Sequence, residues 1–296
     1  MENLTVKKIR VKNILTKSNL PVSDFSVNPY VGCPHACKYC YASFMKRFTN
    51  HAEPWGEFVD VKFWDAVKNP QKYRGKSIFM SSVTDPYNPQ EEIFGRTRAF
   101  LEELRGVDIS LSIQTKSDLV LRDLELIKTF PNVRVGFSIN TLDEDFKRDM
   151  DNAASIARRL AAMKILHEAG IVTTCFISPI FPGITDVKAI IAAVKDQCNL
   201  IWLENLNLRG NFKPAILSYV AEKYPQLSSL YGNIYRRKDL QYWQDLSVEL
   251  EAYAAELGLE YRINDDTAKK SAESPPTIVN FFHHEQIRKF AKKTKV

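Results

Sequence analysis

Three cysteines lie within eight residues near the start of the chain, at Cys33, Cys37 and Cys40. Their spacing is C-x3-C-x2-C, and the two other cysteines, Cys175 and Cys198, stand alone. An odd number of cysteines, three of them on one short loop, is a poor disulfide framework. Three thiolates on one loop suit an iron–sulfur cube better, because the protein then holds three irons and leaves the fourth open to another ligand.

A zinc site is the second metal chemistry that these cysteines allow. Structural zinc usually takes four ligands in two pairs that are far apart in the sequence. A second cysteine pair is missing here, and His35 is the nearby side chain that would have to serve. Three unligated cysteines in a core are the remaining interpretation. The spacing therefore predicts a [4Fe–4S] cluster on Cys33, Cys37 and Cys40, with zinc as the alternative.

The string NPYVGCPHACKYCYA, residues 28–42, resembles the radical S-adenosylmethionine (SAM) superfamily. Within it, the string is similar to the branch of spore photoproduct lyase and the related DNA repair photolyase proteins, and to a small group called radical SAM mobile pair proteins. A second string common in that branch, TDPYNPQE, occupies residues 84–91. The resemblance implies that SAM chelates the open iron and is cleaved reductively to a 5′-deoxyadenosyl radical, which abstracts a substrate hydrogen atom.

The resemblance also implies partners and a substrate class. A nucleic-acid lesion is the first substrate expected, and a peptide or a small metabolite is the alternative. A reducing partner such as flavodoxin or ferredoxin is expected, and a second radical SAM protein is a candidate partner. The rival class is a zinc or nucleic-acid-binding module without catalysis.

Strand-like and helical stretches alternate along the first two thirds of the chain, at about 30 residues per unit. The expected strands are 24–31, 77–83, 109–115, 133–140, 171–178 and 200–204, and the expected helices are 93–104, 118–129, 156–168 and 186–195. Such alternation predicts parallel strands with right-handed crossovers. The expected fold is α/β, a partial (βα)6 TIM barrel of the radical SAM type with a mainly helical C-terminal extension.

Three regions are expected. Residues 1–23 form a basic N-terminal extension, 24–206 the barrel core, and 207–296 a helical extension that packs on the barrel. In the extension, the pattern predicts helices at 212–224 and 239–257, a short strand at 259–263 and a closing helical segment at 277–293.

Ligands of such barrels lie at the C-terminal ends of the strands, and polar residues gather there. The candidates for binding SAM are Tyr39, Ser82, Thr84, Asp85, Lys116, Ser138, Asn140, Arg159, Ile180 and Glu204. Tyr39 directly precedes the last cysteine of the loop, where the family places an aromatic residue beside the adenine. The segment 82–85 stands where relatives use a Gly-Gly-Glu-like segment on the SAM amine.

Each of these candidates also has an ordinary interpretation. Lys116 would pair with the SAM carboxylate, or it is a lysine in a turn. Ser138 and Asn140 would bind the SAM carboxylate or ribose, or they cap a loop. Either Arg158 or Arg159 should face the barrel mouth, unless both are solvated helix residues.

The hydrogen-atom donor of spore photoproduct lyase is a cysteine just after its second barrel strand. Residues 79–89 read FMSSVTDPYNP here and contain no thiol, which argues against repair of thymine dimers by that route. The candidates for this catalytic step are therefore Tyr87, near the mouth, and Cys175, although a free buried cysteine is the default interpretation of the latter.

Composition limits the class of protein. The 296 residues are 45% hydrophobic and 26% charged, as in soluble globular proteins. No apolar run approaches the ~18 residues that span a bilayer, so a cytoplasmic protein without a membrane partner is expected. The net charge of +6 concentrates at the two ends, residues 1–17 and 286–296, which are solvated ends or contacts for a phosphate backbone.

Overall fold

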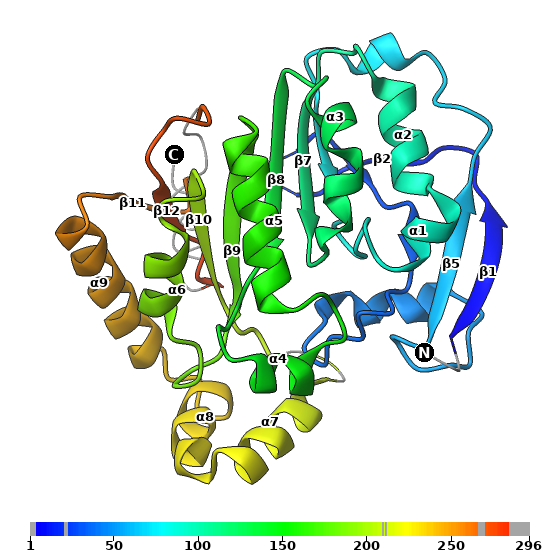
Figure 1. Cartoon of the computed structure of the whole chain (residues 1–296). Coiled ribbons are helices and arrows are strands. Elements are labelled where there is room, and N and C mark those ends of the chain that lie inside the picture. Colours follow the sequence, from blue (N-terminus) through cyan, green and yellow to red (C-terminus); the bar gives the residue numbers. More distant parts are fainter. Residues whose placement is uncertain (1–3, 21–22, 209, 211, 266–269, 284–296) are drawn as a thin grey trace, which may run out of the picture. The chain divides into compact units, whose positions relative to one another are not determined.

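The computed structural model describes residues 4–20, 23–208, 210, 212–265 and 270–283 (Figure 1). The chain divides into two compact units, Met1–Phe137 with Met150–Thr173, and Ser138–Asp149 with Thr174–Val296. Each unit contains parallel strands with helices between them in the sequence. This confirms the α/β class, and parallel strands with intervening helices are consistent with a partial TIM barrel.

The first unit contains two sheets. In the larger, the strand order is β2-β3-β6-β7-β8, with β3, β6, β7 and β8 parallel and β2 antiparallel to β3. In the smaller, β5 lies between β1, which is parallel to it, and β4, which is antiparallel. The strands are β1 Thr5–Arg10, β2 Leu15–Lys17, β3 Phe25–Val27, β4 Tyr30–Val31, β5 Phe58–Phe63, β6 Ser77–Met80, β7 Ser110–Thr115 and β8 Asn132–Ser138.

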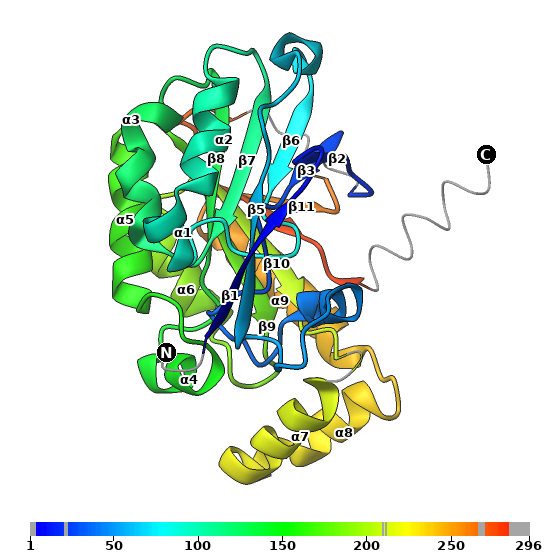
Figure 2. The ribbon, with the colours of Figure 1, turned by 90° about the vertical axis from the view of Figure 1, so that its right-hand side faces the viewer.

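Helices follow these strands in the sequence. They are α1 Gln90–Phe94, α2 Arg96–Leu104, α3 Leu124–Ile127 and α5 Ile156–Glu168, with 3-10 turns η1 Tyr41–Phe48, η2 Pro70–Tyr73 and η3 Asp118–Asp123. Figure 2 shows α1, α2, α3 and α5 along one side of β6, β7 and β8. Leu111 and Ile113 of β7 are fully buried while Ser112 between them is not, as alternation along a helix-covered strand requires.

The buried face of α5 differs from the expected one. The spacing of Leu160, Met163, Leu166 and Ala169 in the sequence predicts that these four share the buried face. Met163 and Leu166 are buried, but Leu160 and Ala169 are only half-buried. Arg159 is fully buried instead. The hydrophobic pattern could not show this, because a buried arginine depends on a partner from another part of the chain.

The second unit has one run of four parallel strands in the order β9-β10-β12-β11. The strands are β9 Val172–Ile180, β10 Leu200–Asn205, β11 Glu260–Ile263 and β12 Thr277–Asn280. The helices are α4 Glu144–Met150, α6 Val187–Val194, α7 Phe212–Lys223, α8 Ser228–Tyr235 and α9 Gln241–Glu256, with the 3-10 turn η4 Pro225–Leu227. The division between the units falls within β8, α4 and β9.

The closing segment 277–293 was expected to be helical, and its beginning is a strand. All four residues of β12 are buried, and the strand is hydrogen-bonded to β10 on one side and β11 on the other. A short apolar run between two strands gains more from completing two ladders than from one isolated helical turn. The rest of that segment, from residue 284, and the basic residues 286–296 lie outside the described residues.

Two further elements differ from expectation. The expected first strand, 24–31, is broken at Asn28 and Pro29 into β3 and β4, which belong to different sheets. The expected N-terminal extension contains β1, whose register places Thr5 beside Phe58 of β5. The expected region boundaries 1–23, 24–206 and 207–296 stay a prediction.

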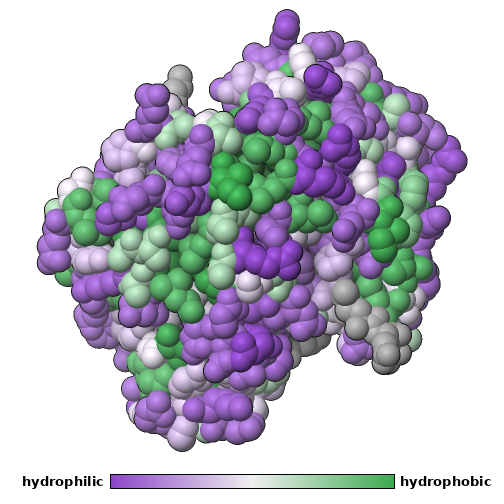
Figure 3. Space-filling view, in the orientation of Figure 1, coloured by the Kyte–Doolittle hydropathy of each residue, from purple (hydrophilic) through white to green (hydrophobic). Residues whose placement is uncertain are grey.

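The small sheet has its own apolar cluster. Tyr30, Val59 and Val61 are buried in it, with Phe63 and Phe94 packed against them. Figure 3 shows apolar residues also gathered at the surface over α1 and β5. Within the described ranges, no helix is both long and apolar enough to cross a membrane.

Candidate active site

The cysteine loop, residues 32–40, connects β4 to η1. It begins at Gly32, whose φ is +82°, and a Cβ there would lie 2.2 Å from the carbonyl oxygen of Phe58. Only glycine allows the chain to pass β5 this closely in that conformation. Cys33 is buried, and Cys37 and Cys40 are half-buried.

Burial controls the ionisation of these thiols. It raises the pKa of Cys33 well above the usual value, and the Asp85 charge adds to the effect. Burial likewise raises the pKa of Cys37 to about 12, and raises that of Cys40. Metal binding lowers the pKa of a thiol that ligates the metal. Independently of these pKa values, three thiols on one short loop are a donor set that fits an iron–sulfur cluster.

Whether metal-binding side chains meet around one metal ion is a separate question. Among residues the structure describes, no three His, Cys, Asp or Glu side chains are grouped to hold one metal ion. In a [4Fe–4S] cube the cysteines need not meet at one point, because each thiolate holds a different iron.

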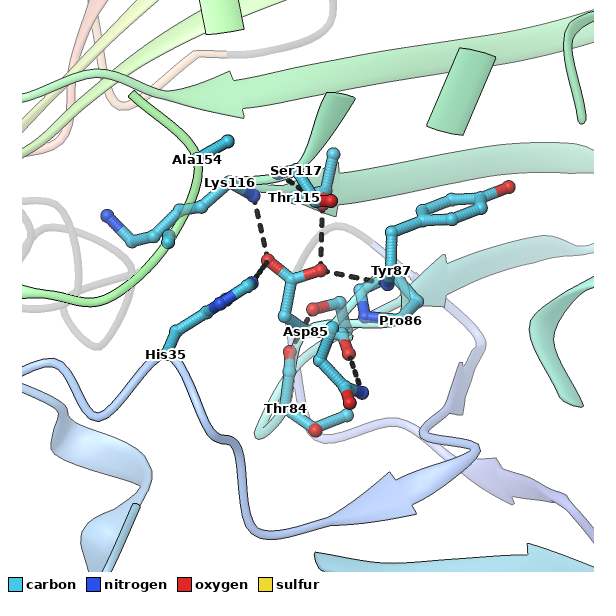
Figure 4. Close-up of polar contacts among 12 residues, drawn as sticks. His35, Thr84, Asp85, Pro86, Tyr87, Thr115, Lys116, Ser117 and Ala154 are labelled. Atoms are coloured by element: carbon cyan, nitrogen blue, oxygen red, sulfur yellow. Dashed lines mark hydrogen bonds and ion pairs between the residues drawn. The ribbon is translucent and has the colours of Figure 1, made fainter. Parts of the chain in front are cut away.

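Asp85 joins the cysteine loop to the end of β7 (Figure 4). Its carboxylate accepts hydrogen bonds from Thr115 Oγ1 and the Lys116 backbone N–H, both at 2.7 Å, and from the Tyr87 N–H at 2.9 Å. The fourth contact comes from the loop, where His35 Nε2 lies 3.2 Å from Asp85 Oδ2. One buried carboxylate therefore connects three segments of the first unit.

These contacts set the charge of Asp85. Burial by itself raises the pKa of the carboxyl, but His35 and the hydrogen bonds from Thr115 and Lys116 outweigh burial and leave the pKa below its usual value. The group is thus an anion that needs its donors, so it holds the loop in place.

The residues after β6 make further connections to the loop. Thr84 Oγ1 donates to the Gly32 carbonyl oxygen at 2.9 Å. Asn28 Nδ2 donates to Ser82 Oγ at 2.9 Å, and the Tyr41 hydroxyl donates to the Ser82 carbonyl oxygen. Thr84 therefore contacts the cysteine loop itself, and Ser82 contacts Asn28 and Tyr41, which flank the loop on either side.

A second polar group lies beside Cys37. Lys116 Nζ donates to Tyr39 Oη at 2.9 Å and lies 3.7 Å from Asp151 Oδ2. Arg159 Nη2 donates to Asp151 Oδ1 at 2.8 Å, and both of these side chains are almost completely buried. Two positive charges thus share one carboxylate.

Asp151 is the residue of this group that the sequence did not reveal. Two backbone hydrogen bonds hold its neighbours against the loop, from Lys38 N–H to the Met150 carbonyl and from Asn152 N–H to the His35 carbonyl, at 2.9 and 2.7 Å. The residue follows a helix and no strand, so the rule of strand ends does not point to it.

The partners of the two neighbouring arginines of α5 show which of them lies at the polar group around Asp151. Arg158 is exposed and pairs with Asp118 at 2.8 Å. Arg159 is the one that reaches the polar group around Asp151, and its Nε also donates to the Ala154 carbonyl at 2.8 Å. Of the two alternatives in the sequence, the structure thus brings Arg159 to the site.

Tyr87 lies close in sequence but points elsewhere. Its ring is fully buried and extends away from His35 and Lys116 (Figure 4). Burial raises the pKa of its phenol well above the usual value, and the nearby charges of Asp123 and Glu91 raise it further.

Gln114 is a second residue that the strand pattern did not single out. It is buried, and neither atom of its side-chain amide has a hydrogen-bond partner in the described part of the chain. Gly136 lies opposite in the β7–β8 register, and a Cβ there would be 2.2 Å from Gln114 Nε2. A buried amide without a hydrogen-bond partner indicates that a ligand or a water binds there. Because side chains alternate along a strand, the Gln114 side chain lies on the same face as that of Lys116.

The remaining SAM candidates belong to the second unit. Glu204 accepts a hydrogen bond from Ser178 Oγ at 2.6 Å. The Asn140 carbonyl accepts one from Thr185 Oγ1 at 2.9 Å, while Asn140 Nδ2 has no partner among the described residues. Ser138 closes β8, and Ile180 is fully buried at the end of β9.

Cys175 lies inside β9 and is completely buried. Burial raises the pKa of its thiol well above the usual value, and the neighbouring thiol of Cys198 contributes. Both are free thiols.

A loop of three thiols tied to the ends of parallel strands defines a class of α/β enzymes that hold an open iron–sulfur cluster. The chain belongs to the radical SAM superfamily, whose family model matches residues 27–193. The family implies SAM and a [4Fe–4S] cluster as cofactors.

Among its relatives, an uncharacterized protein of Methanocaldococcus jannaschii is 39% identical over 78% of this chain and 88% of its own length. The radical SAM Nα-GlyT isomerase of Pseudomonas phage M6 is 26% identical over 53% of this chain and 33% of its own. Spore photoproduct lyase with dinucleoside spore photoproduct shares the fold, with a TM-score of 0.53 and 18% identity over 75% of this chain and 66% of that chain.

Proposed function

We propose that the chain is an enzyme that reductively cleaves SAM at a [4Fe–4S] cluster on Cys33, Cys37 and Cys40, and abstracts a hydrogen atom from a nucleic-acid substrate. The observation that carries the proposal is the polar group beside Cys37. Lys116 and Arg159 bring two positive charges there and Asp151 one negative charge. Lys116, whose Nζ lies 2.9 Å from Tyr39 Oη and 3.7 Å from Asp151 Oδ2, is a cation suited to a carboxylate such as that of SAM.

The cofactors would supply the difficult chemistry: a cluster held by Cys33, Cys37 and Cys40 would provide the electron for the reductive cleavage of bound SAM. The residues of the chain position these groups. Lys116 would bind the SAM carboxylate, with its ammonium group held by Tyr39 at 2.9 Å. Asp85 and Thr84 would keep the cysteine loop in place through His35 and Gly32.

Ser82, in the first unit, is a further SAM contact that we propose. Ser138, Asn140, Ile180 and Glu204 belong to the second unit and stay candidates from the sequence. Asn140 Nδ2 has no partner within the described ranges, which supports a role as donor to a ligand. Tyr87 and Cys175 remain the candidates for the hydrogen-atom step, and a flavodoxin or ferredoxin is the reductant proposed.

The nucleic-acid substrate is supported by the similar proteins. Spore photoproduct lyase has been solved with a dinucleoside spore photoproduct, and with SAM as well. Because these structures are 18% identical to the chain, they support the fold directly and the substrate class only as a proposal.

Cysteine variants test the cluster. Protein with Cys33, Cys37 and Cys40 all changed to alanine should lack the brown absorbance near ~400 nm, bound iron and SAM cleavage. Cys198→Ala removes a buried thiol outside the loop and should keep all three. A triple variant that retains a full cluster would contradict the proposal, and stoichiometric zinc in colourless wild-type protein would support the rival class.

Deuterium transfer tests the substrate. Reduced protein is incubated anaerobically with SAM and either deuterated oligonucleotides or deuterated peptides, and label is followed into 5′-deoxyadenosine by mass spectrometry. Label from the oligonucleotide alone is expected. Label from the peptide alone would overturn the nucleic-acid assignment while leaving SAM cleavage intact.

A further inference from the structure

The segment directly after the third cysteine exposes aromatic rings. In the described part of the chain, the exposed large apolar side chains include three aromatic ones, Tyr41, Phe44 and Phe48, and all three belong to η1. Their exposed fractions are 62%, 41% and 67%. Burying such rings would stabilise the protein, so three exposed rings within eight residues indicate an interaction surface.

The rings are arranged around a cation. The guanidinium carbon of Arg47 lies 5.2 Å from the centre of the Phe44 ring and 5.0 Å from that of Phe48. The two rings are 6.5 Å apart and nearly perpendicular, at 88°. The hydroxyl of Tyr41 is held by the Ser82 carbonyl, so this ring keeps its orientation while exposed.

The charged residues of this segment of the sequence have one sign. The sequence contains no aspartate or glutamate between Asp24 and Glu53, whereas it contains Lys38, Lys46 and Arg47. Lys38 and Arg47 are exposed. The surface thus combines ring faces with positive charge.

This combination fits one class of partner best. Unpaired bases stack on exposed aromatic and guanidinium planes while basic side chains contact the phosphates. An acidic protein such as a reductant would meet the same positive charges, whereas a single nucleic-acid strand also offers a flat π-face at every nucleotide for neighbouring rings to stack on. The rings therefore favour nucleic acid over an acidic protein.

We infer that η1 is a binding surface for the unstacked bases of single-stranded nucleic acid, with Phe44, Phe48 and Tyr41 as stacking residues and Arg47 as the cation between them. The inference rests on the proposed nucleic-acid substrate and adds the surface that holds it. Because η1 begins one residue after Cys40, a strand bound there runs beside the cysteine loop (η1 is the blue helix of Figure 2).

Binding can be measured without turnover. Cluster-loaded protein is titrated anaerobically against a fluorescein-labelled single-stranded oligodeoxythymidylate, and anisotropy gives the affinity. Removing one base–aromatic stack typically weakens binding roughly 5- to 150-fold, so the Phe44→Ala/Phe48→Ala variant should bind at least about tenfold more weakly. The matched variant Phe44→Tyr/Phe48→Tyr keeps the ring faces and should bind like wild type.

Two controls isolate the surface. Ile93→Ala removes an equally exposed apolar side chain in α1 and should leave oligonucleotide affinity unchanged. Circular dichroism of every variant checks the fold. The inference is overturned if the double alanine variant binds as tightly as wild type. It is equally overturned if that variant loses affinity for an acidic flavodoxin but keeps its affinity for the oligonucleotide.

Failure of the proposed function would look different. SAM cleavage is assayed on the same wild-type preparation. Ring-dependent oligonucleotide binding without SAM cleavage would contradict the proposed enzyme and support the η1 surface. SAM cleavage without oligonucleotide binding would support the proposed SAM cleavage and contradict the η1 surface.

Discussion

Asp151 is the residue on which the polar group beside the cysteines depends. It is almost completely buried and shared by Arg159, at 2.8 Å, and Lys116, at 3.7 Å. A buried arginine is tolerated only when its charge is compensated. Asp151 supplies that compensation for Arg159 and lies within ion-pair distance of Lys116 as well.

Removing the Asp151 carboxylate should lower the stability of the folded protein. Asp151→Asn keeps the shape but removes the negative charge that faces the buried guanidinium of Arg159 at 2.8 Å, so we expect a loss of about 3–5 kcal/mol in the free energy of unfolding, measured by urea denaturation. Glu125→Gln breaks an exposed ion pair with Lys128 and should cost less than about 1 kcal/mol. Equal effects of the two substitutions would argue against the buried group.

Lys116 should act on SAM rather than on the cluster. Lys116→Met removes the ammonium group that we assign to the SAM carboxylate, and a hydrogen bond to a charged group is worth about 1.5–3 kcal/mol. SAM affinity, measured by calorimetry, should fall about 10- to 150-fold, while iron content stays constant. Lys213→Met, in α7, is the control. Wild-type SAM affinity in Lys116→Met would remove this lysine from the site.

At the scale of elements, the cysteine loop is shaped by its neighbours rather than by its own regular structure. Gly32 passes the Phe58 carbonyl of β5, and Thr84 and Asp85 after β6 hold the loop from another side. A loop held at several points keeps its ligands in place, which a cluster with one open iron requires.

Gly32→Ala should therefore prevent the loop from forming. The added Cβ would lie 2.2 Å from a backbone oxygen, and the φ of +82° is unfavourable for alanine. We expect a lower melting temperature and loss of iron on reconstitution. Gly75→Ala is a matched control, since φ there is +70° with nothing within 4 Å, and it should show only the backbone penalty of about 1 kcal/mol. Identical behaviour of the two variants would refute the role of close approach.

The strand β12 should be essential to the second unit. Ile278 is fully buried between β10 and β11, so Ile278→Asp would bury an unpaired charge and should cost at least about 3 kcal/mol. Ile263→Asp, in β11, changes the same residue type at 43% exposure and should cost about 1 kcal/mol or less. Denaturation curves compare them, and similar losses would contradict a central position for β12.

At the scale of the whole molecule, the chain shares the fold of spore photoproduct lyase without its thiol after the second barrel strand. Ser81 and Ser82 follow β6 instead. A serine hydroxyl holds its hydrogen too strongly to donate it to a carbon radical, and Cys175 is completely buried within β9. The same fold is therefore expected to support a different final step.

We accordingly predict that the protein will not efficiently repair spore photoproduct. Reduced, SAM-loaded protein should yield 5′-deoxyadenosine with a dinucleotide spore photoproduct but little repaired thymidine dinucleotide, as measured by chromatography. Multiple turnovers to clean thymines would overturn this prediction. A Cys175→Ala variant that loses such repair while keeping SAM cleavage would identify the donor.

Several features of this protein could be predicted from short stretches of its sequence. The thiol spacing identified the cysteine loop, and the expected strands at 109–115 and 200–204 agree with β7 and β10 within a residue. Lys116, Thr84 and Asp85 became candidates because parallel strands bring their C-terminal ends to one edge, and their role in binding SAM stays a prediction. All of these signals lie within a few neighbouring residues, or follow from a general rule of topology.

Only the tertiary structure decided which residues and strands of the chain contact one another. Arg159 is buried because Asp151 reaches it across a turn, β12 is a strand because β10 and β11 flank it, and β1 pairs with β5 some fifty residues away. The strand contacts join segments that are remote in sequence, and Asp151 and Arg159, eight residues apart, are brought together by the turn between α4 and α5. In each case neither partner carries a local sign of the other. Long-range pairing depends on the free energy of the assembled chain, which no single stretch of residues encodes.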